Sequence, residues 1–272
     1  MSLPEGQFAE VGDGLKMHYH AYGDGKPVLF IHGSGPGASG YSNFRHNAPA
    51  FVAAGYQPIL IDSLGYGLSS KPENVDYTLD FMSSGAVRLM DALGHQTFSI
   101  VGNSQGGAQA IRIALEHPDR VEKLILMAPG GLEEREVYME LKGIRSMLRC
   151  IYGPEGITLF GMRKVFEKQL YDPGLVTDEL VQSRYDISMT QPTHVFRTMK
   201  VDNQTEQLHE IACPVLGLWG MNDVFCPPSG AQKLAERCQN ARVTTFTKCG
   251  HWVMVEHKEV FDRLCVDFLT HG

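Results

Sequence analysis

The chain of 272 residues has no excess of basic side chains, because 24 lysines and arginines stand against 31 aspartates and glutamates. The resulting net charge is −7 with neutral histidines. A protein with this balance lacks the basic surface that binds nucleic acid or an anionic membrane. The sequence therefore predicts neither partner, and an anionic small molecule would need a local cation in its site.

Long hydrophobic runs are missing as well. Apolar runs such as residues 124–128 are far shorter than the roughly 20 residues that cross a bilayer. Residues 1–6 carry neither the basic start nor the apolar stretch of a secretory signal. We therefore expect no membrane association and a cytoplasmic location.

Patterns typical of disulfide frameworks and metal sites are also absent from the sequence. The six cysteines are scattered without a C-x-x-C pair, so they are expected to be reduced and mostly buried thiols. The 11 histidines include no H-E-x-x-H or comparable ligand spacing. The sequence thus predicts neither a metal ion nor another cofactor.

The most informative stretch is a G-x-S-x-G motif at residues 102–106. It follows a short apolar β-prone run at 98–101 and precedes a helical pattern at 108–117. Strand, sharp turn and helix in this order form a nucleophile elbow, in which a strained serine exposes its hydroxyl. The flanking glycines remove Cβ atoms that would collide across the turn. We predict that Ser104 is a catalytic nucleophile; the alternative is a structural glycine turn.

Apolar runs alternate with helical spacing over most of the chain. This βαβα order predicts an α/β fold with a mostly parallel, twisted sheet flanked by helices. The run at 15–22 alternates and is expected to be a half-buried antiparallel strand at the sheet edge. The other expected strands are 27–31, 58–62, 98–101, 123–128, 214–219 and 242–246, and the expected helices are 48–54, 79–93, 108–117, 231–238 and 255–269.

The alternation stops between about residue 132 and residue 210, where the pattern is helical and amphipathic. Because strands resume afterwards, we interpret this segment as a helical lid inserted into one core domain. The predicted organisation is core 1–131, lid 132–210 and core 211–272.

A nucleophilic serine needs a base within hydrogen-bond reach and a third group that orients the base. With this type of elbow the chain order is Ser, then Asp or Glu, then His. Asp223 and His251 follow the last two predicted strands, so both are expected at the carboxyl edge of the sheet. They complete a predicted catalytic triad, although a turn aspartate and a core histidine are the plainer alternatives. The other candidate acids are Asp202 and Glu133.

The same chemistry requires an oxyanion hole made of two backbone N–H groups. One candidate is the N–H of Gln105, directly after the serine. The glycine-rich loop 32–37 can supply the other, and we predict the N–H of Ser34. We interpret His32 as a residue that braces this loop.

Several motifs together carry a narrower signal: H-G-S-G-P-G-A at 32–38, Asn43, G-N-S-Q-G-G at 102–107, Arg184 within S-R-Y, and C-G-H-W at 249–252. This set resembles the meta-cleavage-product hydrolases of the α/β-hydrolase superfamily. Members of that family cleave a carbon–carbon bond in 2-hydroxy-6-oxohexa-2,4-dienoates during bacterial degradation of aromatic and steroid rings. The resemblance implies an α/β-hydrolase fold, a homo-oligomer and no cofactor.

The resemblance also implies how an anionic dienoate would bind and react. After ketonisation, attack on the C6 ketone would break the C5–C6 bond and give 2-hydroxypenta-2,4-dienoate and a carboxylic acid. Arg184 would hold the carboxylate and 2-oxo end, because guanidinium is always charged and forks onto a carboxylate. The substrate-binding residues implied in this way are Gly33, Gly35, Asn43, Asn103, Arg184 and Trp252.

These substrate-binding residues have alternative interpretations. Arg184 could lie on the solvated face of a lid helix. Asn43 and Asn103 could satisfy backbone groups, and Trp252 could serve packing.

Two residues depart from the family pattern. Gln105 stands where these relatives usually carry methionine, and its side chain is expected to add hydrogen-bonding capacity near the scissile ketone. Gln169 occupies a lid position where an aromatic residue would be unremarkable. Both weaken the expectation of a biphenyl-type substrate. The alternative functions are a carboxylesterase or lactonase with the same triad, and a non-catalytic ligand receptor on this scaffold.

Overall fold

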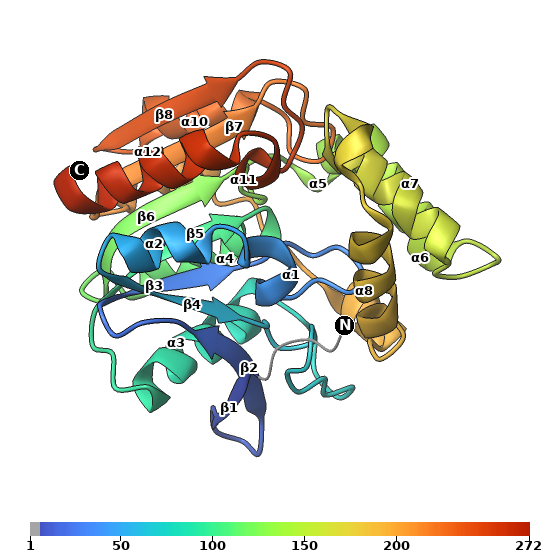
Figure 1. The fold of residues 1–272 in the computed structure, drawn as a ribbon, viewed down its shortest axis with the longest axis horizontal. Coiled ribbons are helices and arrows are strands. Elements are labelled where there is room, and N and C mark those ends of the chain that lie inside the picture. Colours follow the sequence, from blue (N-terminus) through green and yellow to red (C-terminus); the bar gives the residue numbers. More distant parts are fainter. Residues whose placement is uncertain (1–5) are drawn as a thin grey trace.

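The computed structural model describes residues 6–272, which fold around one eight-stranded sheet of order β1-β2-β4-β3-β5-β6-β7-β8 (Figure 1). Strands β3 to β8 run parallel to one another, whereas β2 is antiparallel to both of its neighbours, β4 and β1. The predicted mostly parallel, twisted sheet is confirmed. The strands are β1 (Gln7–Glu10), β2 (Lys16–Ala21), β3 (Lys26–Ile31), β4 (Tyr56–Ile61), β5 (Phe98–Asn103), β6 (Val121–Met127), β7 (Val215–Gly220) and β8 (Ala241–Phe246).

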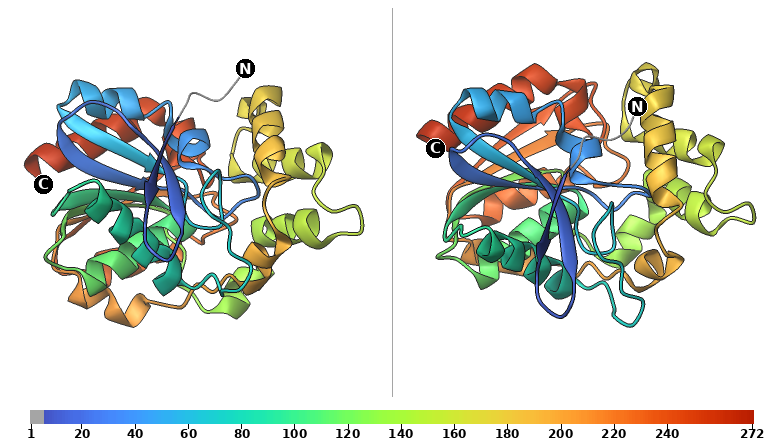
Figure 2. Two further views of the ribbon diagram at one scale, coloured as in Figure 1. Left: turned by 90° about the horizontal axis from the view of Figure 1, so that it is seen from below. Right: turned by 60° about the horizontal axis from the view of Figure 1, so that its bottom comes forward.

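Helices cover both faces of the sheet, and Figure 2 shows the sheet between these two layers. Successive residues of a strand point to opposite faces of the sheet. Phe30 belongs to the hydrophobic core on one face, and Leu29 belongs to the hydrophobic core on the other face. The first layer contains α1 (Gly40–Phe44), α2 (Ala48–Ala53), α11 (Val253–Glu256) and α12 (Lys258–His271). The second contains α3 (Leu79–Ala92), α4 (Gln105–Glu116) and α10 (Ser229–Arg237).

The first predicted strand is antiparallel, but it does not lie at the sheet edge. The predicted edge position was wrong because β1, a short and mostly exposed strand without clear alternation, pairs outside β2. The half-buried pattern was also wrong, since His18 and His20 of β2 are only 4% and 5% exposed. The Asp62 carboxylate lies 2.8 Å from His18 Nδ1, so the polar side chain of His18 is satisfied by a buried partner and not by water.

Three helix predictions need correction. A short helix, α1, precedes the expected first helix, and its N-cap Ser39 accepts the N–H of Ser42. The elbow helix begins at Gln105 rather than at residue 108, because two glycines in its first turn hide its start from periodicity. The last predicted helix is divided at His257 into α11 and α12.

The chain between β6 and β7, all of it within residues 6–272, forms helices joined by loops, and it contains no strand; one residue, Lys200, makes an isolated bridge with Thr78. Since β6 and β7 are direct neighbours in the sheet, this whole segment is inserted between two adjacent strands. It lies beside the carboxyl ends of the parallel strands (Figures 1 and 2). Its elements are α5 (Arg135–Glu140), α6 (Lys142–Tyr152), α7 (Leu159–Gln169), η1 (Pro173–Leu175), α8 (Asp178–Ser188), α9 (Thr193–Thr198) and η2 (Thr205–Glu210).

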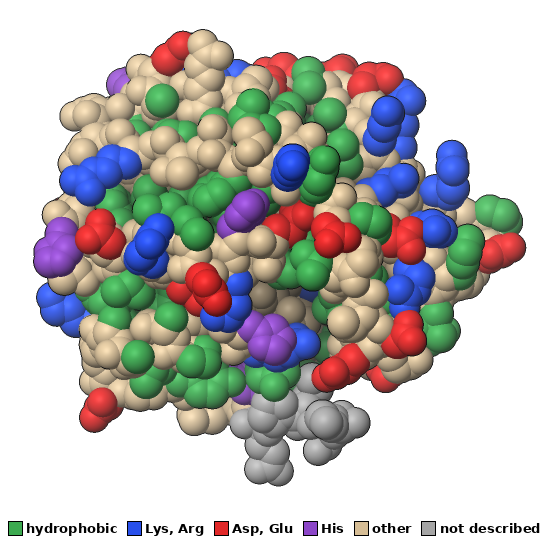
Figure 3. Space-filling model, turned by 45° about the horizontal axis from the view of Figure 1, so that its top comes forward, with side chains coloured by type: hydrophobic (Ala, Val, Ile, Leu, Met, Phe, Trp, Pro, Cys, Tyr) green, Lys and Arg blue, Asp and Glu red, His purple; other side chains and the backbone are tan. Residues whose placement is uncertain are grey.

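The surface mixes charges of both signs, and Figure 3 shows acidic and basic side chains interspersed on one face. Among residues 6–272, no helix is long and apolar enough to cross a membrane. All six cysteines are free and buried, as the sequence predicts.

Candidate active site

Ser104 sits at the turn between β5 and α4, at the carboxyl edge of the sheet. Its backbone has φ 56° and ψ −121°, a conformation that is strained for a residue with a side chain. A Cβ atom on Gly102 would lie 2.5 Å from the carbonyl oxygen of Gly106, and one on Gly106 would lie 2.2 Å from that of Ile31. Only glycine at both flanks permits this turn, which confirms the predicted strand–turn–helix geometry.

Asp223 and His251 come together on the loops that leave β7 and β8. His251 Nδ1 lies 2.6 Å from Asp223 Oδ2, and their side chains are 3% and 0% exposed. The other carboxylate oxygen, Oδ1, accepts the N–H groups of Phe225 and Cys226 at 2.7 and 3.0 Å. Asp223 is therefore fixed and directs the other ring nitrogen of His251 away from itself.

The two other candidate acids lie elsewhere. Glu133 pairs with Lys233 at 2.7 Å, and Asp202 is a largely exposed carboxylate near Arg112. Of the three candidate acids, Asp223 is the one that contacts His251.

His32 determines the orientation of the Gly33–Ser34 peptide. The backbone N–H of Ser63 donates to His32 Nε2 at 3.1 Å, so the ring proton is on Nδ1, which donates to the carbonyl of Gly33 at 2.7 Å. Complete burial lowers the pKa of His32 to about 4, so the neutral tautomer persists at neutral pH. Because the C=O and N–H of a peptide point in opposite directions, the N–H of Ser34 faces away from His32.

Ser34 lines a pocket that also contains Ser104 and His251. The N–H of Gln105 is at the first position of α4, where no helix acceptor exists. The geometry is thus compatible with both predicted oxyanion donors. The side chain of Gln105 behaves differently from its prediction: it does not line the pocket, and its Nε2 contacts Met82 Sδ at 3.3 Å. The expected hydrogen-bonding capacity near the substrate ketone is therefore wrong.

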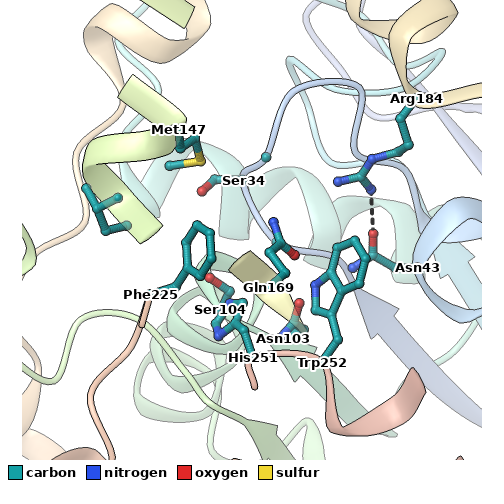
Figure 4. A pocket seen from close by; sticks show the side chains of 13 residues that line it. Ser34, Asn43, Asn103, Ser104, Met147, Gln169, Arg184, Phe225, His251 and Trp252 are labelled. Carbon is teal, nitrogen blue, oxygen red and sulfur yellow. Dashed lines mark hydrogen bonds between the residues drawn. The ribbon is translucent and has the colours of Figure 1, made fainter. Parts of the chain in front are cut away.

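Arg184 projects from α8 into the same pocket and is only 2% exposed. Its Nη1 donates to Asn43 Oδ1 at 2.8 Å and to Ser42 Oγ at 2.9 Å (Figure 4). The guanidinium also lies over the rings of Phe166 and Trp252, at 5.3 and 5.8 Å from their centroids. The alternative of a solvated helix face is wrong for this arginine.

Within residues 6–272, no carboxylate lies within 4 Å of the Arg184 guanidinium. Burial, together with the positive charge of Arg45, lowers its pKa to about 9. A buried cation without a counterion is costly, and such a position favours an anionic ligand. Asn43 does not satisfy backbone here but orients this cation.

The empty space of the pocket, counting the part that is open to solvent, is about 330 Å³. Figure 4 shows Arg184 and Asn43 at one end, Met147 and Phe225 at the other, and Ser104 between them. The Nδ2 of Asn103 donates to the carbonyl of Met127, whereas its Oδ1 accepts no hydrogen bond from residues 6–272. The pocket is lined by Gly33, Ser34, Gly35, Asn43, Asn103, Ser104, Ile144, Met147, Gln169, Arg184, Phe225, His251 and Trp252.

Three apolar lining residues were missed by the sequence analysis: Ile144, Met147 and Phe225. The amphipathic pattern of α6 shows that it has an apolar face but not which of its residues reach the pocket. For Phe225 a signal existed, since it stands two positions after Asp223 and stacks on the His251 ring at 5.3 Å.

Comparisons with known proteins agree with this geometry. The profile of the alpha/beta hydrolase fold family matches residues 26–258. A 2-hydroxy-6-oxononadienedioate/2-hydroxy-6-oxononatrienedioate hydrolase of Comamonas testosteroni is 38% identical, over 95% of this chain and 92% of the relative. A 2-hydroxy-6-oxo-6-phenylhexa-2,4-dienoate hydrolase of Burkholderia cepacia is also 38% identical, with the same coverage of both chains.

A solved structure gives the same result. The meta-cleavage product hydrolase CumD from Pseudomonas fluorescens IP01 superposes with a TM-score of 0.84 at 32% identity, covering 94% of this chain and 95% of that chain. The chain therefore belongs to the α/β-hydrolase family and, within it, to the meta-cleavage product hydrolases.

Proposed function

We propose that this protein hydrolyses the C5–C6 bond of a 2-hydroxy-6-oxohexa-2,4-dienoate in aromatic catabolism. The products are 2-hydroxypenta-2,4-dienoate, or a substituted relative, and a carboxylic acid. The observation that carries the proposal is the buried Arg184 cation, which has no carboxylate partner among residues 6–272 and shares one pocket with Ser104 and His251. A neutral ester gains little from such a cation, whereas a carboxylate-bearing dienoate provides its counterion.

In the proposed mechanism, Ser104 is the nucleophile, His251 the general base and Asp223 the group that orients the base. The substrate first ketonises: its 2-hydroxyl group loses a proton, C5 gains one, and the 2-oxo tautomer results. Ser104 Oγ then gives its proton to His251 and attacks the C6 ketone. The resulting oxyanion is stabilised by the N–H groups of Ser34 and Gln105.

Collapse of this intermediate breaks the C5–C6 bond, and the electron pair leaves on C5 as a carbanion stabilised by the 2-oxo acid. The released carbanion is the dienolate of the product, so the proton given up by His251 ends on the C2 oxygen and 2-hydroxypenta-2,4-dienoate results. The acyl group remains on Ser104. Water then gives a proton to His251 and attacks the acyl carbon, which releases the carboxylic acid and regenerates the serine. These steps use side chains, backbone N–H groups and water, so no cofactor is part of the proposal.

At the other end of the pocket, Arg184 is proposed to bind the substrate carboxylate and Asn43 to hold the guanidinium in place. Trp252 forms a wall beside the dienoate, and Asn103 approaches it from the elbow. Gly33 and Gly35 allow the substrate to lie close to the loop backbone.

The acyl end differs in character, since Met147 and Phe225 line it (Figure 4). Ile144, another pocket residue, lies one helical turn before Met147 on α6 and is therefore assigned to the same end. Arg184 is the only lysine or arginine among the residues that line the pocket of the described chain. A second carboxylate at C6 would meet apolar side chains there. We therefore propose an uncharged C6 substituent.

Residues 132–210 are proposed to act as a lid, because α6, α7 and α8 supply the pocket residues Ile144, Gln169 and Arg184. A cytoplasmic location and a homo-oligomer are proposed from the family resemblance, and sedimentation analysis tests the latter. Neither nucleic acid nor membrane is a proposed partner.

The proposal is tested by following the absorbance of the coloured dienoates. The panel carries methyl, phenyl and carboxyethyl groups at C6, and p-nitrophenyl esters are assayed in parallel. We expect bleaching of the dienoates with uncharged groups to exceed ester turnover. Fast ester turnover without any bleaching would instead support the carboxylesterase alternative, and binding without turnover would support the receptor.

A further inference from the structure

Gln169, the last residue of α7, has a side chain that none of the proposed catalytic steps uses. It is only 4% exposed and lines the pocket with Ser104 and Arg184. Its Oε1 is buried and accepts no hydrogen bond from residues 6–272. A buried amide oxygen without a donor is costly, so its persistence at a ligand pocket indicates a polar partner on the ligand.

The amide lies close to the guanidinium of Arg184. A Cβ atom built on Gly35 would be 3.2 Å from Arg184 Nη2 and 3.7 Å from Gln169 Nε2. Arg184 Nη2 and Gln169 Nε2 therefore both lie next to Gly35, and Gly35 has no side chain that would fill the space between them and a ligand. Because Arg184 uses Nη1 for Asn43 and Ser42, its Nη2 remains for the ligand.

We propose that the Gln169 carboxamide binds the oxygen on C2 of the substrate and thereby selects 2-hydroxy dienoates over dienoates that lack this oxygen. This inference rests on the proposed function and specifies its substrate further. C2 is bonded directly to the carboxylate carbon that Arg184 holds, so its oxygen lies beside the guanidinium. The scissile ketone is several bonds further along, toward Ser104.

A carboxamide suits an oxygen that changes from donor to acceptor during the reaction. The dienol form presents a hydroxyl, which can donate to Gln169 Oε1. After ketonisation the same oxygen only accepts, and Nε2 can donate to it. An aromatic or aliphatic side chain at this position provides neither group.

Asn103 also places an oxygen without a partner among residues 6–272 in the pocket, but beside Ser104, between its two ends (Figure 4). A Cβ atom on Gly33 would be 3.1 Å from Ser104 Cβ and 3.3 Å from Asn103 Oδ1. Asn103 is therefore near the nucleophile, and Gln169 remains the amide next to the carboxylate site.

The test uses Ser104→Ala protein, so that ligands bind without being cleaved. Dissociation constants are measured for a 2-hydroxy-6-oxo dienoate, from its absorbance change, and for the 2-deoxy analogue, by competition. Gln169→Met is expected to weaken binding of the 2-hydroxy compound by roughly 10- to 100-fold and that of the 2-deoxy analogue by less than about two-fold. Equal weakening of both ligands, or no weakening, overturns the inference.

Gln204→Met is the matched control, because Gln204 is buried with an unpartnered Oε1 but does not line the pocket. The selectivity ratio, defined as the dissociation constant of the 2-deoxy analogue divided by that of the 2-hydroxy compound, should be the same in Gln204→Met as in the parent. Because both constants are measured on one preparation, their ratio does not depend on the fraction of folded protein. Gln169→Leu provides a second variant at the tested position. Failure of the parent to bind any dienoate overturns the proposed function together with this inference. Dienoate binding without a change of ratio in Gln169→Met overturns the inference alone.

Discussion

The backbone N–H of His251 donates to the main-chain carbonyl of Gln169 at 2.7 Å. The end of α7 therefore holds the loop that carries the proposed base. One carboxylate strengthens this connection: Glu256 accepts the N–H groups of Tyr171 and Asp172 at 2.7 and 3.0 Å, and that of Gly250 at 2.6 Å. The position of the base thus depends on the inserted helical segment as well as on the sheet.

Replacing Glu256 by glutamine should lower turnover without abolishing folding. One side-chain oxygen becomes an NH₂ group, which cannot accept the backbone N–H groups of its present partners. Displacement of a catalytic group by a fraction of an ångström is costly, so we expect kcat to fall by roughly 10-fold, with KM changed less. Steady-state bleaching assays provide both constants. The exposed Glu259→Gln is the control, and equal loss of kcat in the two variants would contradict this role for Glu256.

Removing the proposed nucleophile should separate binding from turnover. Ser104→Ala is expected to retain dienoate binding and to lose at least about 10³-fold in kcat. Asp223→Asn should also lose turnover strongly, because an amide stabilises the wrong tautomer of His251. Single-turnover absorbance measurements distinguish binding from cleavage. Near-normal cleavage by the alanine variant would remove Ser104 from the mechanism.

His32 should make stability depend on pH in a defined range. Its pKa is about 4 in the folded chain and 6.5 in an ordinary histidine, so between these values the unfolded state binds more protons. The free energy of unfolding should therefore fall as the pH drops from about 6.5 to about 4, by about 1.4 kcal/mol per pH unit from this group. Urea denaturation of the parent and of His32→Gln measures the difference. Parallel pH profiles of the two proteins would show that His32 makes no contribution.

Arg184 is expected to serve ligand binding at a cost in stability. Arg184→Met removes a buried charge that has no carboxylate within residues 6–272, so the free energy of unfolding should rise or change by less than about 1 kcal/mol. At the same time kcat/KM for dienoates should fall by roughly 100-fold, whereas turnover of neutral esters should change little. Thermal unfolding and the paired assays measure these effects. A large loss of stability, or equal loss on both substrates, would indicate a structural role.

Sequence patterns predicted that the elbow, Asp223 and His251 would lie at the same place, because each follows a strand and the loops after parallel strands meet at one edge of the sheet. Short polar elements such as β1 and α1 carry no periodicity, since neither buries a regular apolar face. The direction of a side chain was equally hidden. Gln105 follows the nucleophile, yet its amide points to Met82, because packing between α3 and α4 decides the rotamer.

The inserted segment was the least predictable part of the site. Its amphipathic pattern indicates helices, but the identity of pocket residues depends on how α6, α7 and α8 pack on the core. Gln169 and Arg184 were noticed only through family resemblance. Their burial, and the proximity of Arg184 Nη2 and Gln169 Nε2, follow from tertiary contacts alone.

The apolar acyl end gives the last prediction, which concerns the choice of C6 substituent. Ile144 of α6 lines this end and is only partly buried, so a lysine there can place its ammonium group near the acyl chain while its stem covers apolar surface. Ile144→Lys should raise kcat/KM for a carboxyethyl dienoate relative to a methyl dienoate by roughly 10-fold, and added salt should reduce this gain. Leu159→Lys, at an exposed position of α7 outside the pocket, controls for added charge. An unchanged ratio in Ile144→Lys, or an equal change in both variants, would mean that the C6 substituent does not lie against α6.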